Sequence, residues 1–200
     1  MATHIYQLNM HRSPLASVNL VENHSKEHCI SLVHEPPSRK GQIYSFPHPL
    51  EVLGEPHSNL VDVPRAAIIF NPSLNIWHMP QYSNRDCQVA LWQIHDQKIA
   101  LISAYWPINC NDLINHLETV VASLSHDRYK ILIGIDSNAH HIKWGSPKND
   151  RRGCKLLELM QRHKLLLLNE GTEPTFIGGQ GKSHIDLTII SENLNSMAAQ

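Results

Sequence analysis

Residues 130–153 read KILIGIDSNAHHIKWGSPKNDRRG, and this stretch decides the fold class. The apolar run Lys130–Ile133 predicts a buried strand that runs into Gly134 and ends near Asp136. Beyond a polar loop, apolar side chains at helical spacing predict an amphipathic helix over Arg152–His163. A strand that ends in a carboxylate is typical of layered α/β proteins, whose active sites collect on loops at strand ends.

The segments before this stretch also show strand and helix patterns. Runs rich in apolar, β-branched and aromatic residues predict strands at His4–Leu8, Cys29–Val33, Ala66–Phe70, Asn75–Met79, Gln88–Ile94 and Lys98–Trp106. Ser13 and Pro14 are suited to begin a helix that runs to about Glu27, and a second helix is expected over Asn111–Leu124. Residues 43–64 lack a clear period, which predicts a long connection with one short strand.

The C-terminal part predicts a strand at Leu165–Leu168 and two more at Thr175–Ile177 and His184–Ile190. The last two are expected to be joined by a turn that contains Gly178, Gly179 and Gly181. Several adjacent strands with interspersed helices favour an α/β (α+β) fold, a four-layer sandwich of two mixed β-sheets flanked by helices. Length and composition favour a single domain over residues 1–200.

Composition narrows the function classes. Seventeen Lys and Arg against eighteen Asp and Glu leave a net charge of −1, so any DNA binding must come from a local patch. The four cysteines are scattered, which argues against a zinc knuckle and a disulfide framework. The apolar runs are far shorter than a membrane span, and Met1–Asn9 is unlike a signal peptide. We therefore expect an intracellular protein without a membrane partner.

Six polar residues share one kind of position, because each follows or interrupts an apolar run. They are Asn9, Glu35, Tyr105, Asp136, Asn138 and Asp186. A carboxylate in such a place reaches solvent from a fixed backbone, as a hard cation such as Mg²⁺ requires of its oxygen ligands. Cleavage of a phosphate ester needs such a cation, a base for water and donors for the developing charge. We expect these six side chains to converge on one cleft.

Each of these residues also has an ordinary structural interpretation. Glu35 before two prolines suits a solvated loop, and Asn9 and Asp136 suit turn or cap positions. Tyr105 suits a half-buried strand aromatic. Asp186 is harder to explain in this way, because an ionised carboxylate inside an apolar strand needs a partner such as a histidine.

The loop after Asn138 offers two further hypotheses. His140 and His141 suggest a metal site with Asp136, but structural zinc sites need three or four clustered Cys or His ligands, so zinc is not expected. The cations that follow are suited to neutralise backbone phosphates or simply to form a solvated surface. These cations are Lys143, Lys148, Arg151 and Arg152.

Taken in order, five blocks resemble the endonuclease domains of non-LTR retrotransposons, which belong to the endonuclease/exonuclease/phosphatase superfamily and are related to apurinic endonucleases. The blocks are IYQLNMHRSPLA (5–16), LVHEPP (32–37), ISAYWP (102–107), GIDSNAHHIKWGSPKNDRRG (134–153) and SHIDLTIIS (183–191). The third block is similar to the strand that carries the family's tyrosine, and the fifth is similar to the strand that carries its penultimate catalytic aspartate. The fourth block is the most specific part of the resemblance. The resemblance covers nearly the whole chain.

The resemblance implies a role for each candidate residue. Glu35 would be the principal ligand of Mg²⁺ or Mn²⁺, and Asn9 and Tyr105 would support or contact the scissile phosphate. Asp136 would orient or deprotonate water or assist the leaving oxygen, and Asn138 would hold the phosphate. Thr175 and Ser183 match positions that contact the DNA backbone. The family further implies a nuclear protein that nicks DNA, needs no small-molecule cofactor, and exposes a 3′ hydroxyl for reverse transcription.

The chain also departs from the family pattern. Related enzymes have a Ser-Asp-His motif after the strand that matches Asp186, and its histidine pairs with that aspartate. The sequence ends at Gln200 before such a motif, and His11 stands where some relatives carry an acid. We therefore expect a domain that lacks its last strand and cleaves slowly or not at all. A phosphatase of the same superfamily and a non-catalytic remnant that binds DNA or protein remain alternatives.

Overall fold

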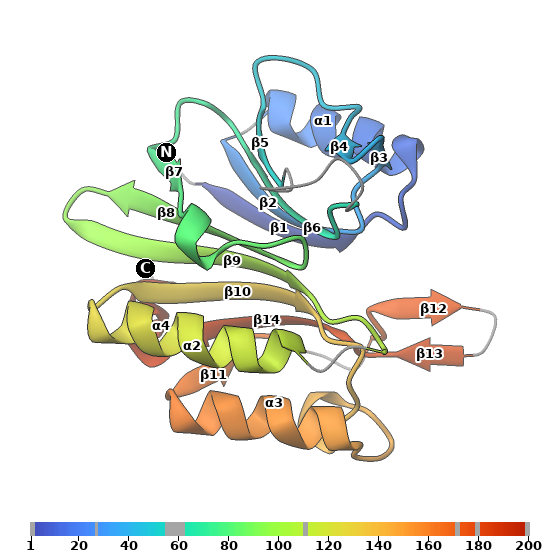
Figure 1. Cartoon of the computed structure of the whole chain (residues 1–200), viewed down its shortest axis with the longest axis vertical. Helices are drawn as coiled ribbons and strands as arrows, with labels where there is room; N and C mark the ends of the chain where they lie inside the picture. Colours follow the sequence, from blue (N-terminus) through green and yellow to red (C-terminus); the bar gives the residue numbers. More distant parts are fainter. Residues whose placement is uncertain are drawn as a thin grey trace.

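The computed structural model describes residues 3–26, 28–54, 63–109, 112–170, 173–178 and 181–198, and it contains two β-sheets packed face to face (Figure 1). The smaller sheet has the strand order β1-β2-β6-β5. Its strands are β1 (His4–Asn9), β2 (Cys29–His34), β6 (Ala66–Phe70) and β5 (Glu51–Leu53). Since β1 and β2 are parallel and the other neighbours are antiparallel, this sheet is mixed.

The larger sheet has the strand order β11-β14-β10-β9-β8-β7. Its strands are β7 (Ile76–His78), β8 (Cys87–Ile94), β9 (Gln97–Tyr105), β10 (Lys130–Asp136), β11 (Leu165–Leu167) and β14 (Asp186–Ser191). The pair β9 and β10 is parallel, and all other neighbours are antiparallel. Both sheets are therefore mixed, as the sequence predicts.

Helices cover the outer faces of the two sheets (Figure 1). Helix α1 (Pro14–Lys26) packs on the smaller sheet, whereas α2 (Asp112–His126) and α3 (Arg151–Arg162) pack on the larger one. A short helix, α4 (Glu192–Ala198), follows β14, and two 3-10 turns lie at Pro80–Tyr82 and Ile142–Trp144. Among the described residues, no helix combines the length and apolarity that crossing a membrane requires.

The apolar core has three layers because side chains alternate along the strands. Ile68 and Phe70 of β6 pack between the sheets, while Ala67 and Ile69 of the same strand face α1. In β9, Leu101 points between the sheets, and its neighbours pack toward α2 and α3. Burial of each large apolar side chain stabilises the fold by roughly 1.5–3 kcal/mol. The two sheets are thus held as one rigid support for the polar residues at their ends.

The sheets come close together at Gly134 of β10. A Cβ atom at this position would lie 2.8 Å from Leu32 Cδ1 and 3.0 Å from Leu32 Cβ, so only glycine fits. Gln7 adds a polar link, because its Nε2 donates to the Ile135 carbonyl at 3.1 Å and its Oε1 accepts from Thr188 Oγ1 at 2.8 Å. These contacts set the spacing of the sheets next to the candidate site.

Most expected elements are present, but three regions differ. The glycine-rich turn does not lead into the last strand: it closes a separate hairpin of β12 (Phe176–Gly178) and β13 (Gly181–Ser183). The reason is that Gly178 pairs directly with Gly181, after which the backbone N–H groups of residues 185 and 186 donate to Thr175 Oγ1 and lead the chain into β14.

The second difference lies in the connection after Glu35. It contains a small hairpin, β3 (Ser38–Arg39) with β4 (Gln42–Ile43), in addition to the expected short strand, which is β5. The third is α4, which the sequence patterns did not indicate. The expected helix ends at Glu27 and Asn111, the turn residue Gly179 and residues 55–62 of the long connection lie outside the described residues.

Candidate active site

Strand register brings the predicted polar residues to one edge of the sandwich. In the smaller sheet, Asn9 at the end of β1 is paired with His34 at the end of β2. In the larger sheet, Asp136 at the end of β10 is paired with Tyr105 on one side and Asp186 on the other. Because β14 is antiparallel to β10, its first residue lies at the same edge as the last residues of β9 and β10.

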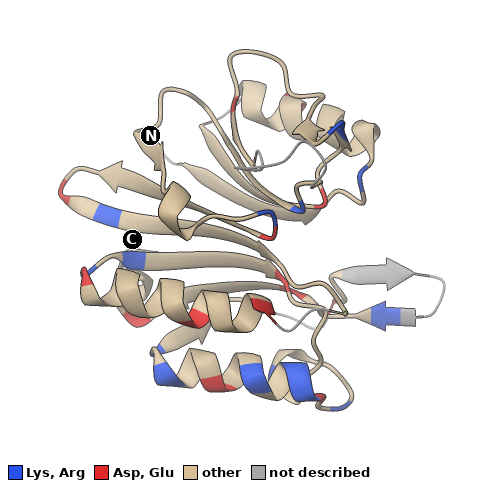
Figure 2. Cartoon of the chain, in the orientation of Figure 1, with Lys and Arg blue, Asp and Glu red and all other residues tan. Residues whose placement is uncertain are grey.

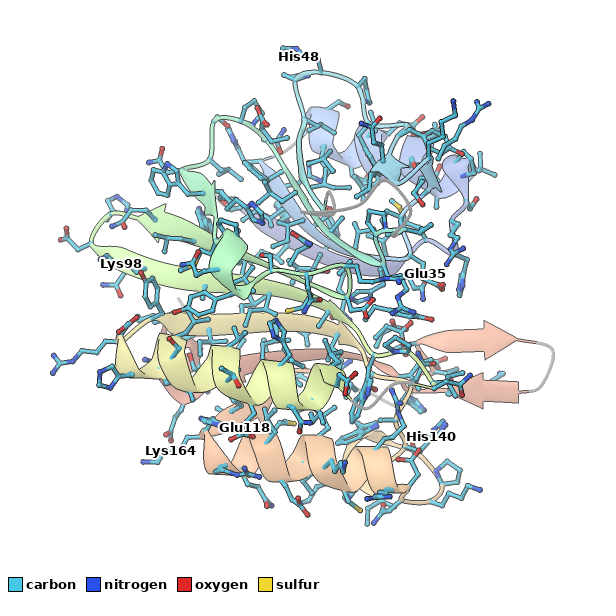
Figure 3. All side chains as sticks on the ribbon, in the orientation of Figure 1. Glu35, His48, Lys98, Glu118, His140 and Lys164 are labelled. Carbon is cyan, nitrogen blue, oxygen red and sulfur yellow. The ribbon has the colours of Figure 1, made fainter. Side chains whose placement is uncertain are left out.

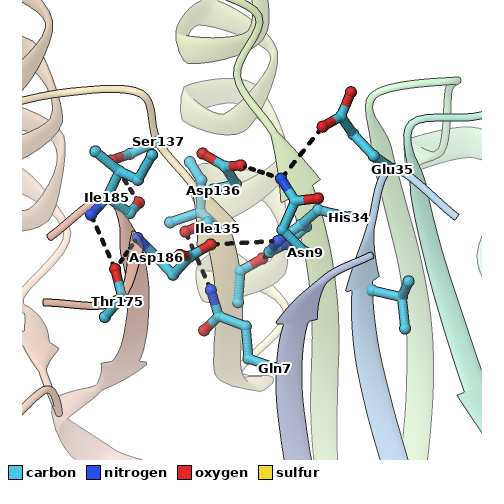
Figure 4. Close-up of polar contacts among 12 residues, drawn as sticks. Gln7, Asn9, His34, Glu35, Ile135, Asp136, Ser137, Thr175, Ile185 and Asp186 are labelled. Carbon is cyan, nitrogen blue, oxygen red and sulfur yellow. Dashed lines mark hydrogen bonds and ion pairs between the residues drawn. The ribbon is translucent and has the colours of Figure 1, made fainter. Parts of the chain in front are cut away.

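Asn9 connects the two sheets at this edge. Its Nδ2 donates to Asp136 Oδ2 at 2.6 Å and to Glu35 Oε2 at 3.3 Å (Figure 4). Its Oδ1 accepts the backbone N–H of His11 at 2.8 Å, which fixes the orientation of the amide. One neutral side chain therefore holds two carboxylates from different strands close together.

Glu35 lies just beyond β2 in a left-handed conformation, with φ of 44°. Its backbone N–H donates to the Arg65 carbonyl at 2.9 Å, and its own carbonyl accepts from the Arg12 N–H at 2.8 Å. These bonds stabilise a backbone conformation that non-glycine residues adopt rarely. The carboxylate is 20% exposed, and Oε2 lies 3.7 Å from His11 Nδ1, so Glu35 presents a fixed but accessible carboxylate.

Tyr105 is held by the neighbouring loop. Its backbone N–H donates to the Asp86 carbonyl at 2.8 Å, and the Arg65 guanidinium lies 5.7 Å from the centre of its ring. Asp86 accepts both the Nε and the terminal N–H of Arg65, so the cation is itself fixed. Burial, together with the carboxylates of Glu35 and Asp136, raises the pKa of the Tyr105 phenol. The hydroxyl is therefore protonated at neutral pH and available as a donor.

Asp136 is buried, and this burial raises the pKa of its carboxyl group. Hydrogen bonds from Asn9 and from the backbone N–H of Asn138 oppose that rise, and the latter reaches Oδ1 at 3.3 Å. Asn138 has φ of 43°, and its Nδ2 donates to the Trp106 carbonyl at 3.1 Å. Asp136 is thus a well-oriented acceptor whose affinity for a proton is increased.

Asp186 faces His34 on the other side of Asp136 (Figure 4). His34 is 0% exposed, its Nε2 lies 3.1 Å from the Gly134 carbonyl, and its Nδ1 lies 3.9 Å from Asp186 Oδ1. Burial lowers the pKa of His34 to about 4, so the ring is neutral at pH 7. Since a carbonyl only accepts, the proton is on Nε2 and Nδ1 carries a lone pair. Burial and then the Asp136 charge raise the pKa of Asp186 to about 7.

Two adjoining cavities contain the six predicted residues. A cleft of about 620 Å³ is lined by five of them and extends to His140, Arg152, Lys182 and Ser183. A neighbouring polar cavity of about 340 Å³ contains Asp186 and shares Asn9, His11 and Asp136 with the cleft. Thr175 lies in this second cavity, where its Oγ1 accepts both N–H groups at the start of β14, whereas Ser183 lines the cleft.

The loop after Asn138 differs from two of the sequence hypotheses. His140 and His141 do not join Asp136: the Nδ1 of His141 accepts the Lys143 N–H at 3.1 Å, and the His140 Nδ1 lies 3.5 Å from Ser146 Oγ. Arg152 is not a surface cation. Its guanidinium stacks 3.9 Å from the centre of the Trp106 ring and donates to several backbone carbonyls, at 2.8–3.1 Å.

Four other basic residues are exposed, and one of them, Lys182, lines the cleft. They are Lys143, Lys148 and Arg151, together with Lys182 on β13. Figure 2 shows basic residues on α3 and on β13, the strand that projects beside the sheets. This arrangement leaves three cations of the predicted basic loop for contact with a partner, while Arg152 holds the backbone behind Asn138.

Sequence reasoning missed His34, which occupies the place where Asp186 needed a partner. His34 belongs to the other sheet and reaches Asp186 only through sheet packing. A signal was present in the sequence CISLVHE, because a histidine that ends a largely apolar strand is a buried polar group in need of a partner. Arg65 was also missed, and nothing in its local sequence indicated it.

The residues present fit a hydrated divalent cation at Glu35. Mg²⁺ dehydrates reluctantly and is often held by one or two carboxylates with several waters. Glu35 offers one partly exposed carboxylate at the mouth of the cleft, whereas the Asn9 amide oxygen is already bonded to the His11 N–H. Figure 3 shows the Glu35 side chain on the same side of the molecule as the β12–β13 hairpin.

Comparison with known proteins gives consistent results. Residues 99–200 match the family described as Endonuclease-reverse transcriptase. The endonuclease domain of TRAS1, a telomere-specific non-LTR retrotransposon, is similar in structure, with a TM-score of 0.78, 25% identity, and coverage of 95% of this chain and 85% of that one. No curated protein sequence matches the chain.

Two more distant structures share the fold. An AP endonuclease from Leishmania major has a TM-score of 0.68 at 8% identity, with coverage of 96% and 79%. A 3′ phosphatase from Neisseria, bound to a product DNA hairpin, has a TM-score of 0.57 at 10% identity, with coverage of 96% and 87%. Since the family match spans half of the chain and the whole sandwich agrees with these structures, the chain belongs to the endonuclease–reverse transcriptase family of the endonuclease/exonuclease/phosphatase superfamily.

Proposed function

We propose that this chain is a divalent-metal-dependent endonuclease that breaks one strand of DNA, as the endonuclease domain of a retrotransposon. One observation supports this proposal above all others: Asp136 lies in register between Tyr105 and Asp186 and is joined to Glu35 through Asn9. A base, a donor and a metal ligand therefore surround one space. Phosphoryl chemistry depends mainly on such positioning and on electrostatic stabilisation.

Glu35 would hold Mg²⁺ or Mn²⁺ in this proposal. When bound, the cation supplies positive charge to the phosphate that is attacked. Its affinity should be weak, because a single accessible carboxylate is available and waters fill the other positions. Replacing Glu35 with Gln should then abolish specific Mg²⁺ binding in calorimetric titration.

The other residues of the cleft have roles that follow from their atoms. The Asp136 carboxylate, oriented by Asn9 and Asn138, accepts a proton from the attacking water, and its raised pKa strengthens it as a base. The Tyr105 hydroxyl donates to a non-bridging phosphate oxygen. Water oxygen bonds to phosphorus as the bond from phosphorus to the 3′ oxygen breaks, and that oxygen takes up a proton. The products are a 5′ phosphate and a 3′ hydroxyl.

DNA is the expected substrate because the structural relatives include an endonuclease domain, an AP endonuclease and a phosphatase bound to DNA. The shape and charge of the site support a long polyanion. The cleft extends from Glu35 to Lys182, and Lys182 and Arg152 contribute cations to its lining. A net charge of −1 makes these local contacts the source of affinity, which should be modest and sensitive to salt.

A plasmid-nicking assay in Mg²⁺ tests the proposal. Conversion of supercoiled to open circular DNA requires one break per circle, so even slow cleavage is detected. We expect slow nicking by the wild type, loss of that nicking in Glu35→Gln and Asp136→Asn, and the wild-type rate in Glu118→Gln. Glu118 is a matched control on α2, where it pairs with Arg162 and His163 away from the cleft (Figure 3).

The alternative activity is removal of a terminal phosphate, which one structural relative carries out at a 3′ end. An oligonucleotide with a 3′ phosphate and a closed circular DNA, offered in parallel, separate the two activities. Release of phosphate without nicking would overturn the endonuclease proposal. Equal nicking by wild type and Glu35→Gln would overturn the assignment of the site.

A further inference from the structure

We propose that His34, Asp136 and Asp186 form a second cation site, separate from Glu35 and selective for a divalent transition metal such as Mn²⁺, Co²⁺ or Zn²⁺. The donor atoms of these three side chains all lie within 4.8 Å of one another. They come from three strands, β2, β10 and β14, and from both sheets. In the described part of the chain, this is the cluster of His and carboxylate donors close enough to share an ion.

The orientation of His34 is the first argument. Its ring is completely buried, and its Nε2–H donates to the Gly134 carbonyl, which leaves the Nδ1 lone pair directed toward the carboxylates. Metal-binding histidines are commonly fixed in this way, with the second ring nitrogen bonded to a backbone carbonyl. The support for a metal ligand is therefore built into the sheet interface.

The second argument is an electrostatic conflict. His34 Nδ1 and Asp186 Oδ1 are both buried, neither has a hydrogen-bond partner, and they face each other at 3.9 Å. Two lone pairs in a buried place repel each other unless a positive charge lies between them. Asp136 adds a second carboxylate to the same space, so a divalent cation would satisfy all three side chains at once.

The donor set selects the kind of ion. An imidazole nitrogen with two carboxylates suits first-row transition metals, whereas Mg²⁺ prefers oxygen ligands alone. Donor atoms around one zinc ion lie up to about 4 Å apart, so small side-chain rotations would close the site. The ion has a path from solvent, because Asp136 and Asp186 line the polar cavity of about 340 Å³ and His34 lies behind them.

The site would lie close to the one at Glu35. Asn9 donates to Asp136 and Glu35 with the same nitrogen, so the two carboxylates are separated by a single amide. The inference does not depend on DNA cleavage, however, since it concerns metal binding by residues other than Glu35. The two sites are therefore distinguishable by variants that each remove one of them.

Titration of chelator-treated protein with Co²⁺, followed by visible absorption and proton NMR, tests the inference. Co²⁺ on His34 should shift the Nε2–H signal far outside the diamagnetic range, and its bond to Gly134 should slow exchange with solvent. We expect this signal in the wild type and in Glu35→Gln, and its loss in His34→Gln. Co²⁺ affinity should fall at least about tenfold in His34→Gln, since even indirect support of a ligand contributes that much.

His24→Gln is the matched control. His24 is also a buried histidine, but it bonds Ser31 Oγ at 2.8 Å and belongs to no cluster of metal-ligand side chains among the described residues, so replacing it should leave Co²⁺ binding unchanged. Circular dichroism checks that each variant folds, and Asp186→Asn replaces His34→Gln if the latter does not. Wild-type protein without the shifted signal, or a folded His34 or Asp186 variant with wild-type affinity, would overturn the proposal and show that a proton fills the gap.

Discussion

On one side of Asp136, hydrogen bonds join the polar atoms, whereas on the other side two buried atoms face each other without one. The Asn9 side consists of Asn9 and Asn138, which donate to Asp136, and of Glu35, which accepts from Asn9. The His34 side consists of His34 and Asp186. One edge of the sandwich therefore contains both a hydrogen-bonded, preorganised group of side chains and a pair of buried polar atoms without hydrogen bonds. Buried polar atoms that lack a partner mark places where a ligand can bind favourably.

The largest expected effect comes from breaking the Asn9 side. Asn9→Ala removes the donor that holds two carboxylates together, so Asp136 loses its orientation and its pKa should rise further. Removal of one oxyanion-hole donor lowers a catalytic rate by about 10²–10³-fold, and we expect a loss of similar size from this positioning residue. Plasmid nicking under single-turnover conditions measures this loss.

Asn71→Ala is the control for that experiment. Asn71 also bonds neighbouring backbone groups, the Cys29 N–H and the His24 carbonyl, but it lies outside the cleft. Its replacement should lower stability while the rate per folded molecule is retained. An Asn9→Ala rate within threefold of wild type would mean that the Asn9 side is not preorganised by this amide.

The second largest effect is expected when the buried charge of Asp186 is removed from the His34 side. The pKa of Asp186 is raised to about 7 from 3.8, so its contribution to stability is complete below about pH 4 and is lost as the pH rises to about 7. In a chelating buffer, Asp186→Asn should be more stable than wild type, and its advantage should grow by about 2–3 kcal/mol between pH 5 and pH 8. Urea unfolding at the two pH values measures it.

Asp96→Asn, in an exposed hairpin turn, serves as the control and should show no such growth. If the difference in unfolding free energy between Asp186→Asn and wild type stayed constant from pH 5 to pH 8, burial would not destabilise the ionised Asp186 carboxylate. Asp186→Asn should also bind Co²⁺ poorly. The carboxylate that lowers the stability of the free protein would therefore be the one that binds the metal.

A smaller effect concerns the support behind the Asn9 side. Arg152 and Asn138 donate to the same Trp106 carbonyl, and Arg152 also bonds the Ser137 carbonyl. Arg152→Met should lower the free energy of unfolding by about 1–3 kcal/mol, because buried carbonyls lose charged donors. Arg151→Met changes the exposed neighbour and should have little effect. Equal unfolding free energies for the two variants would contradict this role.

The smallest effect is expected from the exposed cations. Replacing Lys143, Lys148 and Arg151 together with Ala should weaken DNA binding severalfold and reduce the salt slope by about one for each lost phosphate contact. Fluorescence anisotropy at several salt concentrations gives both quantities. An unchanged slope would show that the basic loop is only a solvated surface.

The sequence contained most of the fold because its strands are strongly apolar and its polar residues stand where the strands end. Ala66–Phe70 and Lys130–Asp136 are clear in this respect, and the structure has them as β6 and β10. Local sequence patterns do not predict the structure of segments whose conformation depends on tertiary contacts. The start of β14 depends on Thr175, whose hydroxyl oxygen accepts the backbone N–H groups of residues 185 and 186.

The same limit applies to the candidate site. The end positions of Asn9, Glu35 and Asp136 could be predicted because strand ends are visible in sequence. The pairing of His34 with Asp186 could not, because it depends on how closely the sheets approach at Gly134. For Arg152, the sequence predicts a location that the structure does not have. The neighbouring residues indicate a surface cation, whereas the guanidinium stacks on Trp106 and lies against the backbone.

The hydrogen bond between Gln7 and Thr188 spans 181 positions of the chain. Contacts between residues this far apart in sequence raise the contact order. Chains with high contact order fold slowly, because the entropy of closing the loop is lost before the contact stabilises the chain. During synthesis, β1 emerges from the ribosome long before β14, so Gln7 can bond Thr188 only after the segments between them have been translated. Since Asp186 is the first residue of β14, a nascent chain gains its complete polar cluster only after this strand has been synthesised.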